Sequence, residues 1–123
     1  MSLKTKIEKR GEGTYVIKAE GRLDTDTYTS FEEKIKPLMA LPTKTLIFDM
    51  SALVYISSSG LGVIFNTKKS LEEINGSLII TNLQPQIRKV FEIIDALTKV
   101  NVFDSMREVE SYLSAIQRTE VDK

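Results

Sequence analysis

The sequence predicts an α/β fold with a central mixed β-sheet and helices packed on it. Two segments near the N-terminus alternate apolar and polar residues, short apolar runs follow, and segments of helical periodicity lie between and after these runs. Strands that alternate with helices pair in parallel, whereas a leading hairpin pairs antiparallel. The expected order is β-β-α-β-α-β-α-β-α. Because 123 residues suit one domain, we expect a single domain over residues 1–117 and a charged, frayed tail over residues 118–123.

The chain begins with a predicted hairpin. Alternation over residues 3–10 predicts a half-buried strand, and residues 14–20 predict the strand that pairs with it. The sequence Gly11-Glu12-Gly13 between them is typical of a turn. The residues on the apolar face of the first strand are Leu3, Thr5 and Ile7.

A helix follows from about residue 25, where apolar residues recur at three- and four-residue steps. Asp24, Thr25 or Asp26 can cap this helix, and Pro42 follows its end. Two carboxylates without further clustered ligands favour a cap over a cation site, so we expect no metal here. The predicted buried face carries Tyr28, Phe31, Ile35 and Leu38.

The middle of the chain adds a strand and a helix. The apolar run 46–48, which ends at Asp49, predicts a short strand covered on both faces. A loop over residues 50–58 then leads to a helix that starts near Ser59 and ends before Asn75.

The last third repeats this order. Residues 78–80 predict a buried strand, Pro85 suits the first turn of the next helix, and residues 100–103 predict a short strand. Ser105-Met106-Arg107-Glu108 has the form of a capping box, which predicts the start of the last helix. The predicted buried residues of these two helices are Ile87, Val90, Phe91 and Ile94, then Met106, Val109, Leu113 and Ile116.

Three polar loops are expected at one edge of the sheet, where parallel strands end and helices begin. They carry Asp24, residues 49–59 and Asn82. Because sites in such sheets gather at this edge, these loops are the candidates for function.

The composition excludes several classes of function. The chain has neither histidine nor cysteine, which removes the Ser-His-Asp triad, thiolate catalysis, disulfides and the commonest metal ligands. It carries 17 basic and 17 acidic residues, so no net field attracts nucleic acid or anionic membranes. No signal peptide or membrane span is apparent, and we expect a cytoplasmic protein that acts by binding rather than by catalysis.

One segment is unusual: Ser57, Ser58 and Ser59 stand directly before Gly60-Leu61-Gly62, where a loop is expected to become a helix. Ser59 is predicted at or next to the N-cap, where unpaired backbone N–H groups and the helix dipole tolerate an anion. The glycines leave room for another backbone or a phosphate. A serine at an N-cap is also a common structural feature, with no further function.

Nucleotide binding at residues 59–62 is an alternative. The segment lacks the third glycine of the dinucleotide fingerprint and the Gly-Lys-Ser/Thr of a P-loop. The Gly-x-Ser-x-Gly elbow of hydrolases is absent as well. On the predicted helix, Leu61, Ile64 and Phe65 share one face and are expected in the core. Val63, or the backbone of Gly62, is then expected to face a partner.

Several segments resemble STAS domains of the bacterial anti-sigma factor antagonist type. Residues 49–51 and 56–64 are similar to the family's Asp-Leu-Ser and Ser-Gly-Leu-Gly segments, which surround its phosphorylation loop. Residues 20–24 resemble its Gly-x-Leu-Asp turn. Residues 79–91 resemble its strand, Asn-Leu-x-Pro segment and third helix, and residues 97–105 resemble its closing strand and the start of its last helix. The resemblance covers almost the whole chain in the same order.

This resemblance implies a STAS-like α/β fold and a regulatory, non-enzymatic function. Unphosphorylated members bind an anti-sigma factor, usually also a GHKL-type serine kinase, and so release a sigma factor. Phosphorylation of the serine before Gly-Leu-Gly blocks this binding, and a PP2C-type phosphatase restores it. By position the acceptor is Ser59, with Ser57 and Ser58 as alternatives. The resemblance implies no cofactor, no direct contact with nucleic acid and no membrane.

In one place the chain departs from the family pattern. An aspartate usually stands two residues before the acceptor, and this chain has Ser57 there. The loss leaves open an altered kinase, weaker phosphorylation, or a STAS interaction module without a phosphorylation cycle. The residues expected at the partner-binding site are Asp24, Ser57, Ser58, Gly60, Leu61, Gly62, Val63 and Asn82.

Overall fold

The described part of the chain forms a five-stranded mixed sheet with four helices, as the sequence predicts. The structure, a computed structural model, describes residues 2–93 and 101–121, with side chains as far as residue 115. In the sheet order β1-β2-β3-β4-β5, the pair β1–β2 is antiparallel and the other pairs are parallel. The strands are β1 (Leu3–Gly11), β2 (Thr14–Leu23), β3 (Thr45–Ile56), β4 (Ser77–Thr81) and β5 (Asn101–Phe103), and the helices are α1 (Tyr28–Met39), α2 (Ser58–Glu73), α3 (Pro85–Ile93) and α4 (Met106–Val121).

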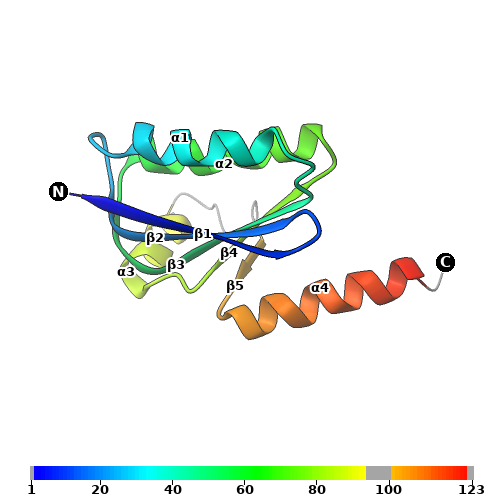
Figure 1. Cartoon of the computed structure of the whole chain (residues 1–123). Helices are drawn as coiled ribbons and strands as arrows, with labels where there is room; N and C mark the ends of the chain where they lie inside the picture. The colour runs from blue at the N-terminus through cyan, green and yellow to red at the C-terminus, as the bar shows by residue number, and fades with distance from the viewer. Residues whose placement is uncertain (1, 94–100, 122–123) are drawn as a thin grey trace.

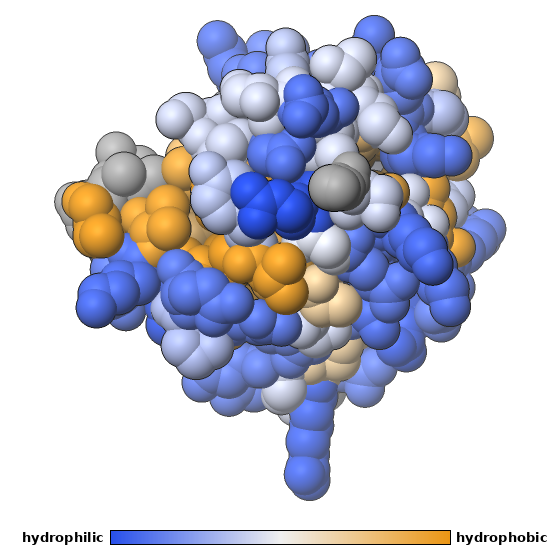
Figure 2. All heavy atoms as spheres, turned by 90° about the vertical axis from the view of Figure 1, so that its left-hand side faces the viewer, coloured by the Kyte–Doolittle hydropathy of each residue, from blue (hydrophilic) through white to orange (hydrophobic). Residues whose placement is uncertain are grey.

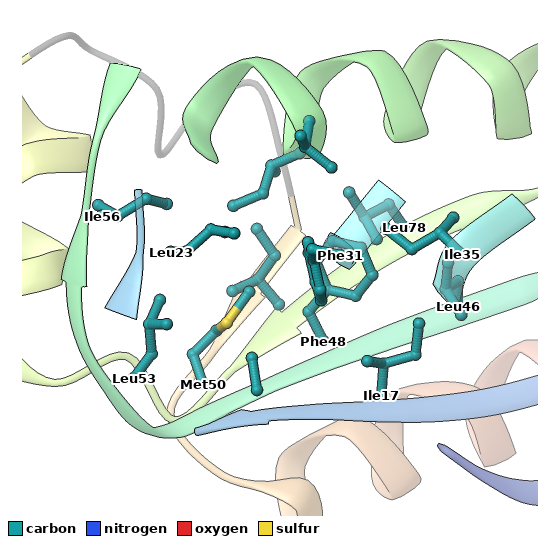
Figure 3. Close-up of a cluster of buried hydrophobic side chains, with 14 of the residues drawn as sticks. Ile17, Leu23, Phe31, Ile35, Leu46, Phe48, Met50, Leu53, Ile56 and Leu78 are labelled. Atoms are coloured by element: carbon teal, nitrogen blue, oxygen red, sulfur yellow. The ribbon is translucent and has the colours of Figure 1, made fainter. Parts of the chain in front are cut away.

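The helices cover both faces of the sheet. Figure 1 shows α1 and α2 side by side on one face and α4 on the other. The main core lies on the α1–α2 side, where the rings of Phe31 and Phe48 pack edge to face with centroids 5.3 Å apart. Ile87 and Phe91 of α3 join the same core. Figure 3 shows part of this core, with Phe31 and Phe48 at its centre. No helix of the described residues is long and apolar enough to cross a membrane.

Helix α4 is held by a smaller cluster on the opposite face. Val109, which is fully buried, packs there with Val16, Ile47 and Ile79 of three neighbouring strands. The predicted capping box starts this helix, since the Ser105 hydroxyl accepts a hydrogen bond from the Glu108 N–H at 3.3 Å. In β3, the neighbours Ile47 and Phe48 are buried on opposite faces of the sheet. This confirms the prediction that the apolar run 46–48 is covered on both faces.

Three expectations about the elements are wrong. Ile7 is 44% exposed because β1 is an edge strand, and α1 covers only its beginning. The last helix continues to Val121, through most of the segment expected to be a frayed tail. Strand β3 does not end at Asp49 but continues to Ile56, because β2 continues to pair with it as far as Leu23. The predicted positions Ile94 and Val100, and the side chain of Ile116, lie outside the described residues.

Two irregularities bend the extended part of β3. The pairing of β2 with β3 shifts register between Lys18 and Glu20 and again between Gly21 and Arg22, and at each shift β3 carries an extra residue. Such bulges increase the bend and twist of a strand. Figure 3 shows β3 curving away from the plane of the sheet toward α2, so that Leu53 and Ile56 close the end of the core. The bend brings the serine segment over the end of β2.

Candidate functional site

The serine segment is fixed to the end of β2 by its backbone. The Ser57 N–H donates a hydrogen bond to the Leu23 carbonyl at 2.9 Å, directly after the last pair of the ladder, Leu23 with Ile56. A Cβ atom on Gly60 would lie 2.8 Å from the Leu23 side chain and 2.9 Å from its carbonyl oxygen. Helix α2 therefore begins in direct contact with Leu23, and only glycine fits at position 60 without a shift of the backbone.

The N-cap of α2 is Ser57, not Ser59. The Ser57 hydroxyl accepts a hydrogen bond from the Gly60 N–H at 3.2 Å, and the first intrahelical bond runs from Leu61 to the Ser57 carbonyl. Serine and aspartate cap helices about equally well. Ser57 stands where the STAS pattern has aspartate, and it caps the helix without bringing a negative charge.

Ser58 and Ser59 form the first turn of α2. Ser58 is exposed and Ser59 is half-buried, and within the part of the chain that the structure describes neither hydroxyl has a hydrogen-bond partner. Asn66 and Ser70 lie seven and eleven residues after Ser59, about two and three turns further along the same side of α2. Both line a groove of about 160 Å³ between α2 and α1. Ser59 therefore lies on the flank of α2 that faces α1, and Ser58 faces outward.

Asp24 organises the turn between β2 and α1. Its carboxylate accepts hydrogen bonds from the Asp26 N–H at 3.0 Å and the Thr27 N–H at 3.1 Å, and Arg22 Nε approaches it at 3.4 Å. The N-cap of α1 is Thr27, so the expected cap at residues 24–26 is instead a hydrogen-bonded turn before the helix. The turn follows directly from Leu23, which places Asp24 beside the start of α2.

The hydrogen bonds of this turn favour the charged form of Asp24. Burial works to raise the pKa of the carboxyl, whose side chain is 16% exposed, but the hydrogen bonds from Asp26, Thr27 and Arg22 together lower the pKa below its ordinary value. A fixed negative charge therefore stands next to the serine segment at neutral pH.

Arg22 links the turn to the end of β3. Its guanidinium lies 4.1 Å from the centroid of the Tyr55 ring, while Nε contacts Asp24. Arg22 pairs with Tyr55 in the ladder directly after the second register shift, which follows Gly21 in β2. Gly21 has a φ of 109°, a conformation that glycine adopts readily. The bulge therefore fixes where Arg22 and Tyr55 meet.

The rest of the predicted site divides into buried and accessible residues. Val63 is only 3% exposed and belongs to the core, so the expectation that it faces a partner is wrong. Ile64 is fully buried as expected, whereas Leu61 is only partly buried against the core. A Cβ atom on Gly62 would meet nothing within 4 Å among the described residues, so the open glycine of this segment is Gly62 and not Gly60.

Asn82 meets the segment 49–59 as expected, but at its first residue, Asp49. Its amide donates to Asp49 Oδ1 at 3.1 Å and its N–H contacts the Phe103 carbonyl at 3.3 Å, both at the end of the β4 pairing. The site was expected to unite three loops, but β3 runs on past Asp49 and carries the serine segment away from Asn82. The hydrogen bond between Ser57 and Leu23 joins the serine segment to the strand end that precedes Asp24, while Asn82 contacts Asp49, eight residues before Ser57.

The sequence did not predict the contacts that Arg22, Leu23 and Tyr55 make around this candidate site. The Gly-x-Leu-Asp motif in the sequence marks Leu23 and Asp24. It does not predict which residues of β3 lie beside them. Among the described residues, no group of three or more acidic side chains is placed to hold a metal ion.

Comparisons with known proteins identify the fold and its relatives. The sequence model of the STAS domain matches residues 6–109. The anti-sigma-B factor antagonist of Staphylococcus aureus is 30% identical over 79 residues, which cover 64% of this chain and 73% of that protein. The structure of the anti-sigma factor antagonist SpoIIAA in its unphosphorylated form is 26% identical with a TM-score of 0.69, and the match covers 95% of this chain and 98% of that chain. A part of the murine anion transporter Slc26a9 shares the fold at 18% identity and a TM-score of 0.73, covering 84% of this chain and 18% of that chain.

The two glycines of the serine segment provide a matched pair of variants. Gly60→Ala places a methyl group against the Leu23 backbone, and we expect it to lower the free energy of unfolding by about 1–3 kcal/mol. Gly62→Ala adds the same methyl group in open space and gains helix propensity, so we expect a rise of about 0.5–1 kcal/mol. Chemical denaturation of both variants measures these values. Equal stabilisation by both substitutions would contradict the close contact at Gly60.

The Asp24 turn predicts a specific pH dependence of stability. A carboxyl whose folded pKa is lowered contributes stability that is present above its unfolded pKa, near the reference value of 3.8, and is lost as the pH falls through the folded pKa. The stability difference between wild type and Asp24→Asn should therefore be constant above about pH 5 and shrink below about pH 4. Denaturation from pH 3 to pH 7 measures this difference, with Asp26→Asn as the control for loss of a charge from the same turn. A difference that stays the same at pH 3 and pH 7 would be incompatible with this role of Asp24.

Proposed function

This chain belongs to the STAS domain family, and we propose that it is an anti-sigma factor antagonist whose binding is switched off by phosphorylation of Ser59. The observation that carries the proposal is the position of Ser59, half-buried in the first turn of α2 and beside the Asp24 turn. Its hydroxyl is without a hydrogen-bond partner among the described residues. The anti-sigma-B factor antagonist of Staphylococcus aureus, named above, supports the same function.

The proposed binding surface is the outer side of the first turns of α2. Ser58 and Gly62 lie four residues apart and share this side, and Leu61 flanks it. Gly60 and Val63 are not part of the exposed surface. They support it, because Gly60 packs against β2 and Val63 packs in the core. Figure 2 views this end of the molecule and shows a band of hydrophobic residues across it. At the adjacent end of β3, Val54 is 49% exposed and Tyr55 is 40% exposed.

A phosphate on Ser59 is suited to act as a switch at this surface. It adds about −1.5 to −2 charge, which the start of a helix tolerates in the free protein. In a close interface the same charge has to be desolvated, and a buried charge that the partner does not match costs about 2–5 kcal/mol. The negative charge of Asp24 adds repulsion at the same place. The modification can therefore abolish binding while the fold stays intact.

The partners follow from this function. We propose that an anti-sigma factor with GHKL-type serine kinase activity binds the unmodified protein and phosphorylates it. A PP2C-type phosphatase then restores the unmodified form. The cycle is placed in the bacterial cytoplasm and requires no cofactor, no catalysis by this chain and no contact with DNA or membrane.

A second candidate is a STAS interaction module without phosphorylation. Ser57 favours it, because the cap that replaces the family aspartate carries no carboxylate for a kinase to recognise. In that case the surface of α2 still binds a protein, and changes at Ser59 have no more effect than other surface changes.

Phosphorylation and binding distinguish the two candidates. The protein is incubated with ATP and an anti-sigma factor that has GHKL-type serine kinase activity. The phosphate is mapped by mass spectrometry, and Ser59→Ala, Ser58→Ala and Ser57→Ala are compared. We expect phosphate on Ser59 alone. We also expect Ser59→Asp to weaken binding to the anti-sigma factor by roughly 30-fold or more, the equivalent of about 2 kcal/mol.

Ser70→Asp is the control for the binding measurement, because it adds the same charge to α2 three turns from the proposed surface. The proposal fails if no phosphate appears on Ser59 and if Ser59→Asp binds as tightly as Ser70→Asp. That pair of results favours the unregulated module.

A further inference from the structure

We propose that the cleft between the β1–β2 turn and α4 binds a small molecule that has an apolar body and an ammonium group. The cleft has a volume of about 370 Å³, which is at the lower end of the range of about 300–1,000 Å³ for small-molecule sites. Figure 1 shows α4 below the turn that joins β1 and β2. Because α4 lies on the opposite face of the sheet from α1 and α2, this site is separate from the serine segment, and the inference goes beyond the proposed function.

The floor of the cleft is apolar. Ile47 of β3 and Val109 of α4 line it, and they are only 1% and 0% exposed. Leu113 also lines the cleft and lies one turn after Val109, on the same side of α4. Thr14 of β2 lines the cleft as well. It stands two residues before Val16, which belongs to the cluster around Val109, so both side chains lie on the α4 face of the sheet.

The mouth of the cleft carries more carboxylates than cations. Its charged lining residues are Arg10, Glu12 and Glu110. Arg10 is already paired, with Nη1 3.1 Å from Glu110 Oε1 and Nε 3.4 Å from Glu8 Oε1. Glu12 forms no ion pair within the described ranges 2–93 and 101–121. Three carboxylates therefore surround one guanidinium, and a ligand with an ammonium group, which donates three hydrogen bonds, complements this mouth.

Three other cations are close in the chain or the fold but do not line the cleft. Lys9 pairs with Tyr15, whose side chain packs on the α1–α2 side, so Lys9 points to that face as well. Lys44 lies beside the turn at Gly13. Arg107 lines a separate hollow on α4. The excess of carboxylates at the mouth of the cleft is therefore not cancelled by a neighbouring lining residue.

A ligand in this cleft would connect α4 with the hairpin. At the mouth the two elements are joined by the ion pair of Arg10 with Glu110, whose side chains are 41% and 59% exposed. Such exposed pairs contribute little to stability. A ligand that packs on Ile47 and Val109 and pairs with Glu110 adds contacts to the sheet and to α4 in the folded state alone. Its binding should therefore raise the melting temperature of the protein.

The experiment uses the full chain and three probes that share a phenyl ring. They are 2-phenylethylamine, which is cationic at neutral pH, the neutral 2-phenylethanol and the anionic 3-phenylpropionate. Methyl NMR at constant ionic strength follows Ile47, Val109 and Leu113, whose resonances a nearby aromatic ring shifts. We expect saturable shifts with the amine at a dissociation constant of about 0.1–10 mM, in keeping with the small size of the probe, and binding of the carboxylate that is at least about tenfold weaker.

Two variants with similar ion pairs test the charge at the mouth of the cleft. Glu110 and Glu72 are 59% and 60% exposed, and they pair with Arg10 at 3.1 Å and with Lys68 at 2.9 Å. We expect Glu110→Gln to weaken binding of the amine about fivefold and to change binding of the alcohol less than about twofold. Glu72→Gln should change neither. Thr14→Phe adds a ring from β2 and should abolish the shifts with all three probes.

The proposal is overturned if the amine causes no saturable shift at the three followed residues, or if Glu110→Gln and Glu72→Gln bind it equally well. Equal binding of the three probes would also overturn it, because the cleft would then accept apolar molecules without regard to charge. The melting temperature of Thr14→Phe without ligand shows whether this variant is folded. If it is not, the comparison of the two glutamine variants decides the outcome.

Discussion

The contact between Gly60 and Leu23 is the constraint on which the site depends. It sets α2 directly onto the end of β2, with no room for a Cβ atom between them. The hydrogen bond from Ser57 to the Leu23 carbonyl and the cap that Ser57 provides fix the same junction. Because the Asp24 turn follows Leu23 directly in the sequence, this backbone contact also joins the turn to the start of α2.

The bend of β3 makes this junction possible. A strand that ended at Asp49 would leave the serines beside Asn82, in the middle of the parallel sheet. The bulges and continued pairing with β2 instead carry the chain over the end of the core, where Leu53 and Ile56 are buried. The site therefore lies between β2 and α2, at the side of the sheet where the hairpin packs.

Much of the fold could be predicted from local patterns, and much of the site could not. The hairpin, the apolar runs and the helical faces carry periodicities that specify which side of each element is buried, and Phe31, Phe48 and Val109 are buried as expected. The extension of β3 was missed because Ser51, Ala52 and Tyr55 interrupt its apolar pattern. Its pairing depends on β2, which lies far away in the sequence.

The errors at the site have the same origin. Val63 and Gly62 are neighbours on a helix whose first turns are apolar on nearly every side, so periodicity alone could not assign the buried face. That assignment depends on Leu23, since Gly60 must face it and Val63 follows three residues later. The contact of Arg22 with Tyr55 depends on the register shift between Gly21 and Arg22, where β3 carries an extra residue, and such a shift is not visible in the sequence.

The central claim is that one charge on Ser59 controls binding without altering the fold. Isothermal titration calorimetry of the anti-sigma factor with the unmodified chain and with the chain carrying phosphoserine at position 59 tests it most directly. The account predicts that the phosphorylated form binds at least about 30-fold more weakly, while circular dichroism and the melting temperature show the same fold. Equal dissociation constants for the two forms would contradict it.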